Sequence, residues 1–198
     1  MRVAEVTYLV RMRTILRPAA AALVLFAALA ATGCTPEPAK PHTPAPSSTP
    51  LFASDEEALA AAEEAYAAYL AVSDQISAEG GLYPERIDAH VVPELRDQAR
   101  KSLEAFRERN LHTAGLSSFD STRLQGVSYP EAGGAKVTIY ACLDIGSVRL
   151  ISESGSDVTP ADRVDRLPLQ VSFVSETPPS TLLLQSSDSW SGENFCAG

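Results

Sequence analysis

The chain has 198 residues, of which 45% are hydrophobic, and its 25 Asp and Glu outnumber its 16 Lys and Arg. The net charge of −9 leaves no basic excess for binding phosphate backbones, so we expect no nucleic-acid partner. Three cysteines allow at most one intramolecular disulfide and leave one cysteine over.

An apolar run of 13 residues, Ala19 to Ala31, follows a segment that holds four arginines. Positive charge before a short apolar run is typical of a secretory signal peptide. The run is too short for a membrane span, which needs roughly 20 apolar residues. We therefore predict a signal peptide over residues 1–33, with translation starting at Met1 or Met12. No twin-arginine pair occurs, which favours the general secretory route. A buried helix or an uncleaved anchor is the alternative.

Small residues and a cysteine close this run, in the sequence Ala31-Thr32-Gly33-Cys34. The pattern resembles the lipobox of bacterial lipoproteins. The resemblance implies that Cys34 is lipidated on its sulfur and holds the chain at the outer face of the cell membrane. Removal of residues 1–33 takes away four Arg and one Glu and leaves a net charge of −12. Anionic headgroups should repel so acidic a chain, so membrane binding should depend on the lipid alone.

Six prolines lie between Thr35 and Pro50, where almost nothing is apolar. Such a composition cannot form a core and favours extended polyproline conformations of roughly 3.1 Å per residue, or about 50 Å in all. We predict a spacer over residues 34–51, with a proline-rich recognition motif as the alternative. A lone His42 without a second ligand gives no metal site.

The first half of the remaining segment, residues 52–198, has the 3.6-residue period of helices. A capping box of Ser54 and Glu57 begins the first helix, and Gly80-Gly81 ends it. Pro84 and Pro93 suit the first turns of a short helix and of a longer one. The apolar stripe of the first helix comprises Leu59, Ala62, Tyr66, Tyr69, Leu70 and Ile76.

After Asn110–Gly115, which we interpret as the end of the last helix, the period changes to the two residues of a strand. Pro168 should confine the beginning of its strand to an edge or a bulge. Helices followed by strands predict an α+β domain with an antiparallel sheet. The expected strands are Thr122–Tyr129, Ala135–Leu143, a short Val148–Ile151, Arg166–Glu176 and Thr181–Ser187, with hairpin turns at 130–134 and 177–180.

This order of elements, over about residues 54–190, resembles the nuclear transport factor two-like cone. The resemblance implies a curved four-stranded antiparallel sheet that wraps around the first helix and leaves a pocket. A cystatin-like sheet is the nearest structural alternative. The segment Tyr140–Asp144, together with Trp190 and Cys196, is also similar to small secreted lipoproteins of actinobacterial type.

Cys142 and Cys196 remain as an even pair once Cys34 carries a lipid. In an oxidising compartment such a pair predicts a structural disulfide, which would fix the tail after Trp190 to the second expected strand. A redox or metal pair is the alternative, but no CxxC spacing or clustered histidine supports it.

One alternating set of the second strand must face the first helix. The odd set, Val137, Ile139, Ala141 and Leu143, is wholly apolar, whereas the even set would bring Asp144 inward. We expect the odd set inside, since the other register would bury a carboxylate. The predicted pocket is therefore lined by Leu59, Ala62, Tyr66, Leu70, Val137, Ile139, Ala141 and Leu143.

Candidates for catalysis are few. Asp144 is either a general base in the pocket or a turn residue before Gly146, and the second interpretation is favoured. His90 and His112 fit capping or surface roles. The acidic residues between Glu153 and Asp165 depart from the spacing of a calcium loop, so we expect no metal.

No phosphate-binding loop, GxSxG elbow or HExxH motif occurs, and we expect no cofactor. The sequence thus favours a non-catalytic envelope lipoprotein that binds a partner protein or a small apolar ligand. The alternative is an isomerase or dehydratase of the ketosteroid isomerase kind. An enzyme would need at least two convergent polar groups in an apolar pocket.

Overall fold

A computed structural model describes residues 50–130, 133–175 and 181–197. The predicted signal peptide, Cys34 and nearly all of the spacer lie outside these residues, as do part of the first predicted hairpin turn, 130–134, and all of the second, 177–180. Within the described ranges, no helix combines the length and the apolar character that crossing a membrane requires.

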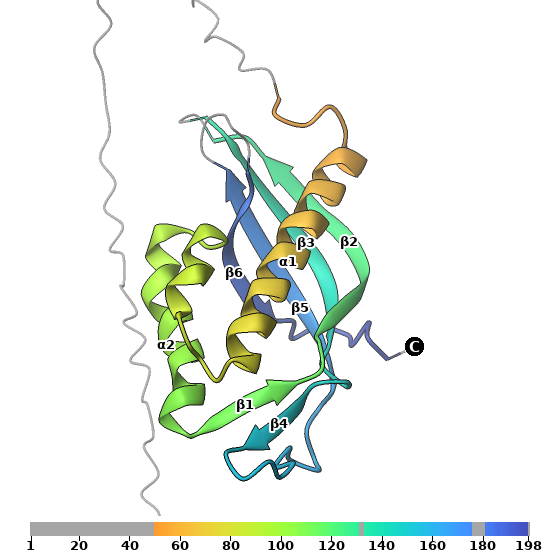
Figure 1. The fold of residues 1–198 in the computed structure, drawn as a ribbon. Helices are drawn as coiled ribbons and strands as arrows, with labels where there is room; N and C mark the ends of the chain where they lie inside the picture. Colours follow the sequence, from red (N-terminus) through yellow and green to blue (C-terminus); the bar gives the residue numbers. More distant parts are fainter. Residues whose placement is uncertain (1–49, 131–132, 176–180, 198) are drawn as a thin grey trace, which may run out of the picture. The chain divides into compact units, whose positions relative to one another are not determined.

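The domain is α+β, with helices packed on a four-stranded antiparallel sheet of order β2-β3-β5-β6, as predicted. Figure 1 shows α1 crossing one face of this sheet, with α2 next to β6. A separate two-stranded sheet joins β1 and β4. The elements are α1 (Asp55–Ala78), η1 (Pro84–Ala89), η2 (Pro93–Leu95), α2 (Arg96–Glu108), β1 (Leu111–Ala114), β2 (Ser118–Ser128), β3 (Ala135–Asp144), β4 (Arg149–Ser152), β5 (Arg166–Ser175) and β6 (Leu183–Ser189).

Helix α1 begins and ends where its capping residues lie. The Ser54 hydroxyl accepts the Glu57 N–H at 3.3 Å, and the Glu57 carboxylate accepts the Ala53 N–H at 2.6 Å. At the other end, Gly81 has a φ of +77° and its N–H donates to the Ile76 carbonyl at 2.8 Å. A Cβ at Gly81 would lie 2.3 Å from the Leu103 carbonyl oxygen, so glycine lets the end of α1 approach α2 closely.

The segment after α2 differs from the prediction. Asn110–Gly115 was expected only to end the helix, but it contains β1, which pairs antiparallel with β4 in the register His112 opposite Ile151. Four residues are too few for a clear alternation, so the strand depends on a partner far along the sequence. Strand β2 also begins earlier than expected, at Ser118.

Strand β5 is central in the sheet, but its pairing with β6 begins only at Leu169. The beginning of β5, up to Pro168, is therefore an edge on that side, as predicted. Pro168 faces Cys142 of β3, while its carbonyl accepts the Trp190 N–H at 2.8 Å. The N–H and C=O of one strand residue point to the same side. The N–H that proline lacks would therefore point toward β6, at a position beyond the last β5–β6 pair, Leu169. The pairing with β3 does not use it and is intact.

The hydrophobic core lies between α1 and the sheet. Ala62 and Tyr66 of α1 and the odd residues Val137, Ile139 and Ala141 of β3 are at most 1% exposed. Phe173 of β5 is also fully buried, and its ring meets that of Tyr66 edge-on at 6.3 Å. Burial of this apolar surface is the main force that holds the helix on the sheet.

Candidate functional site

The eight residues predicted to line a pocket pack into this core. Ala62, Tyr66, Val137, Ile139 and Ala141 are fully buried within it, and the other three, Leu59, Leu70 and Leu143, are partly buried and pack against it. None of these eight residues lines any of the five cavities found among the described residues. These side chains belong to the packed core between α1 and the sheet.

Asp144 lies at the end of β3, on the surface. Its carboxylate accepts the Gly146 N–H at 2.8 Å and pairs with Arg166 at 2.8 Å, and Arg166 also binds Asp120. The Gly146 amide first and the Arg166 guanidinium second hold the pKa of Asp144 below its ordinary value. A general base needs a raised pKa, so this arrangement is that of a strand-end turn residue.

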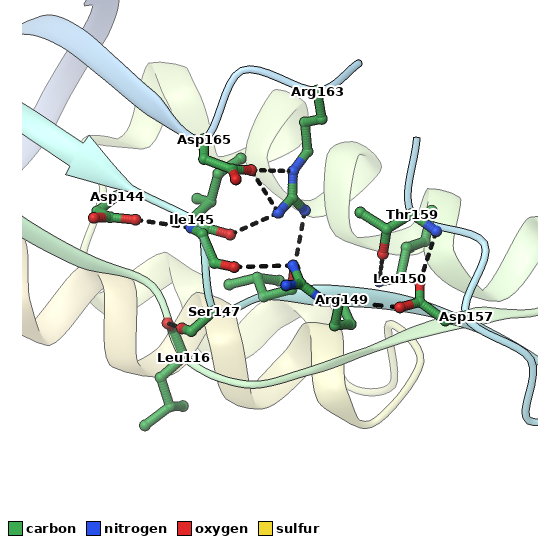
Figure 2. A network of polar contacts seen from close by, with 12 residues as sticks. Leu116, Asp144, Ile145, Ser147, Arg149, Leu150, Asp157, Thr159, Arg163 and Asp165 are labelled. Atoms are coloured by element: carbon green, nitrogen blue, oxygen red, sulfur yellow. Dashed lines mark hydrogen bonds and ion pairs between the residues drawn. The ribbon is translucent and has the colours of Figure 1, made fainter. Parts of the chain in front are cut away.

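Polar contacts also organise the loop that follows Asp144 (Figure 2). Arg163 donates to the carbonyls of Val148 and Ile145, both at 2.9 Å, and binds Asp165. Asp157 caps the Thr159 N–H at 2.9 Å. Asp157 and Asp165 thus have amide or arginine partners, and the described residues contain no group of three metal-ligating side chains.

Two of the three histidines of the chain, His90 and His112, lie among the described residues. His90 ends η1, where its N–H donates to Ile87 and its carbonyl accepts the Leu184 N–H at 2.9 Å. His112 lies in β1, opposite Ile151. Neither residue is a partner of Asp144, whose bonds go to Gly146 and Arg166.

Cys142 and Cys196 form a disulfide, as the sequence predicted. The bond fixes the C-terminal tail to the sheet face opposite α1, where Tyr140 contacts the rings of Trp190 and Phe195 at 4.9 and 5.9 Å. A buried disulfide between residues 54 positions apart restricts the unfolded chain strongly.

The largest cavity described, about 560 Å³, lies between α1, α2 and β6. Its apolar lining comes from Tyr69 on α1, from Leu103 and Phe106 on α2, and from Leu184 on β6. Ser73, Ser102 and Ser187 also line the cavity. We call this cavity the helix–strand cleft.

Tyr66 lies behind this cleft and links α1 to β6. Burial, opposed by a hydrogen bond with Ser187, raises the pKa of Tyr66 to about 12, so its hydroxyl is neutral at physiological pH. Burial also raises the pKa of Tyr69, which lies on the wall of the cleft. The cleft therefore offers neutral hydrogen-bonding groups and one carboxylate, Asp188.

Sequence reasoning missed this cleft because its walls come from three separated segments. Tyr69, Ser73 and Ser77 recur at four-residue steps on α1, which places them on one helix face. Their position against α2 depends on the turn at Gly81, and the contribution of β6 depends on strand order. The four-residue spacing was the only signal in the sequence.

No protein-family model and no curated protein matches this chain. Solved structures share only remote similarity with it. The intermembrane space region of the chloroplast protein ARC6 has a TM-score of 0.43 at 10% identity and covers 68% of this chain and 97% of its own. A periplasmic fragment of TraM has a TM-score of 0.41 at 15% identity, and the match covers 70% of this chain and 98% of the fragment. Aln2 from a Streptomyces species has a TM-score of 0.38 at 13% identity, and the match covers 66% of this chain and 88% of Aln2. Similarity at this level carries no argument about family or function.

Proposed function

We propose that this chain is a lipid-anchored, extracytoplasmic lipoprotein with a nuclear transport factor two-like domain, and that it binds a partner protein without catalysis. The lipobox-like sequence that ends at Cys34 supports export and anchoring. The helix–strand cleft is the binding site, and its occupant is an extended segment of an envelope protein. The observation that carries this proposal is the open edge of β6 within the cleft.

Consecutive residues of β6, from Leu184 to Asp188, line the cleft, so the edge of the strand faces it. Strand β6 pairs with β5 on its other side. The Trp190 N–H points to β5, because it donates to Pro168. Backbone groups alternate along a strand, so those of Ser187 point to the open edge. An open edge of this kind binds extended peptides by strand addition.

The chain itself fills the beginning of the same edge. The segment His90–Val92 runs parallel to β6, where Val92 donates to the Leu184 carbonyl at 3.0 Å and Leu184 donates to His90 at 2.9 Å. The cleft begins where this pairing stops. A strand from a partner would continue the same pairing, with alternate side chains against Leu103 and Phe106.

Asp188 is the one charged residue that lines the cleft. A carboxylate at the rim favours a partner segment with a Lys or Arg at the matching position. The acidic net charge of the domain favours basic segments as well. The expected occupant is therefore an extended, partly apolar segment with at least one basic residue.

The enzymatic alternative depended on Asp144 in an apolar pocket. Asp144 is bound to Arg166 and Gly146 instead, so an isomerase or dehydratase would need another general base. The neutral Tyr66 and Tyr69 do not fill that role at physiological pH, since burial raises the pKa of both. Non-catalytic binding is the function that the geometry supports best.

Site-specific photo-crosslinking in the native membrane tests this proposal. A photoreactive residue at Gln185, which is exposed and lines the cleft, should give one protein adduct. Mass spectrometry of the adduct should place the link in an extended segment that contains a Lys or Arg. The same photoreactive residue at Lys101, exposed on α2 but outside the cleft, should give none.

Two variants at one position separate backbone pairing from side-chain contact. Ser187→Pro removes the outward N–H but keeps the ladder to β5, and it should abolish the adduct. Ser187→Ala keeps the N–H and should preserve the adduct. Equal adducts at Gln185 and Lys101 would contradict the cleft as the site, and adducts only with lipid would favour a small apolar ligand.

A further inference from the structure

A second cavity lies on the sheet face opposite α1, under the C-terminal tail. Its volume is about 460 Å³, within the range of small-ligand sites. Three aromatic and three polar side chains line it: Tyr140, Trp190, Phe195, Arg123, Glu193 and Asn194. We call this cavity the tail pocket.

The tail pocket is held rigidly by contacts that join the tail to the sheet. The disulfide fixes Cys196 to β3, Arg166 donates to the Cys196 carbonyl at 3.3 Å, and the Asn194 side chain accepts the Cys196 N–H at 2.9 Å. At Gly192, an added Cβ would lie 2.5 Å from the Trp190 indole, so the tail backbone packs directly on that ring. A preorganised aromatic wall binds ligands at a low entropic cost.

Two charged side chains line the tail pocket, the Arg123 guanidinium and the Glu193 carboxylate, and the guanidinium is the group that can bind an anion. Arg123 lies opposite Tyr140 in the β2–β3 register and is exposed. No ion pair found among the described residues involves Arg123, whereas Arg166 nearby is bound to both Asp120 and Asp144. The free guanidinium matches a carboxylate, and the rings beside it match an apolar ring face.

A row of uncharged polar groups continues from the tail pocket along the same face. Gln170, opposite Tyr140, donates to Gln125 at 2.6 Å, and Thr138 contacts Ser172 at 3.1 Å. A further hollow, about 360 Å³, includes Thr138 and Lys136. Amides and hydroxyls in a row suit a polymer that presents hydroxyls at each unit, and a single aromatic acid would leave them unused.

We propose that the tail pocket binds one ring of a glycan that carries carboxylates, with Arg123 on the carboxylate and Trp190 on the ring face. The rest of the glycan lies along the polar row of β3 and β5. The acidic domain repels dense polyanions, so the ligand carries sparse carboxylates separated by neutral sugars. This site is separate from the helix–strand cleft and adds a second binding activity.

Fluorescence titration tests the proposal directly, because Trp190 is the single tryptophan of the chain. The probe is a hyaluronan tetrasaccharide, in which uronic acids alternate with neutral N-acetylated sugars. The full-length protein in detergent should show a saturable change in emission. Chitotetraose, the neutral counterpart, should bind at least ten times more weakly.

Variants identify the groups responsible. Arg123→Gln should weaken hyaluronan binding at least tenfold, whereas Arg109→Gln, another exposed arginine, should leave it unchanged. Trp190→Ala, followed by calorimetry, should abolish binding. Equal affinity for both tetrasaccharides, or no binding of either, would overturn the proposal. Binding of benzoate with the same dependence on Arg123 would overturn it in favour of a small aromatic acid.

Discussion

The two faces of β3 are covered in different ways. On the face toward α1, Val137, Ile139 and Ala141 are fully buried by a helix whose stripe can be recognised in the sequence. On the other face, Cys142 is equally buried, but its cover is the tail that the disulfide holds. The first face is covered by a helix that packs through its apolar stripe, and the second by a tail that one disulfide holds in place. Reduction of the disulfide should therefore leave the packing of the first face intact and loosen the cover of the second.

The largest effect should follow from breaking the disulfide. Reduction, or the double replacement Cys142→Ser and Cys196→Ser, should lower the free energy of unfolding by about 4 kcal/mol, since 54 positions separate the cysteines. Urea unfolding with and without reductant measures the loss. A loss below about 1 kcal/mol would show that the tail is held mainly by its aromatic contacts.

The next largest effect should be a difference in unfolding free energy between substitutions at two neighbouring residues of β3, one on each face. Ile139→Ala creates a cavity in the core and should cost about 3 kcal/mol. Thr138→Ala, on the outer face, removes the contact with Ser172 and should cost about 1 kcal/mol or less. Urea unfolding of both variants tests the comparison. Equal losses would mean that the two faces are not packed differently.

The buried Tyr66 should make the inner face sensitive to alkali. Because its folded pKa of about 12 exceeds the unfolded value of 10, its contribution is complete below pH 10 and is lost as pH rises toward 12. At pH 11 the loss should be about 1.4 kcal/mol relative to pH 8. Tyr66→Phe should remove this part of the alkaline slope and leave the part due to Tyr69. An unchanged slope would contradict the burial of the Tyr66 hydroxyl.

A smaller effect should appear in acid on the outer face. Arg166 lowers the pKa of Asp120 and contributes to the lowering at Asp144. Carboxylates with lowered folded pKa values stabilise above the ordinary pKa of 3.8, and this stability is lost as pH falls through the folded values. Arg166→Gln should therefore flatten the fall of Tm below pH 4. A fall as steep as in wild type would contradict these pairs.

The periodic parts of the fold were predictable from the sequence. Ser54, Glu57 and the glycines after Ala78 bound α1, and the apolar odd set of β3 identifies its inner face, because these signals are local. The disulfide was predictable by elimination, since Cys34 was assigned to the lipid.

The parts that depend on distant partners were not predictable. Strand β1 exists through its pairing with β4. The helix–strand cleft was missed for the same reason, since its walls are separate in sequence. Tyr66 and Ile139 were expected beside a pocket, and both side chains are fully buried in the core.

Lipidation of Cys34 is the central claim, because the proposed location and envelope partner both depend on it. The direct measurement is metabolic labelling with a fatty-acid analogue, followed by separation of membrane and soluble fractions. The wild-type chain should carry the label and remain with the membrane. Cys34→Ala should lose the label and leave the membrane fraction, since a domain of net charge −12 is repelled by anionic lipid. An unlabelled wild type, together with unchanged membrane retention of Cys34→Ala, would contradict the account.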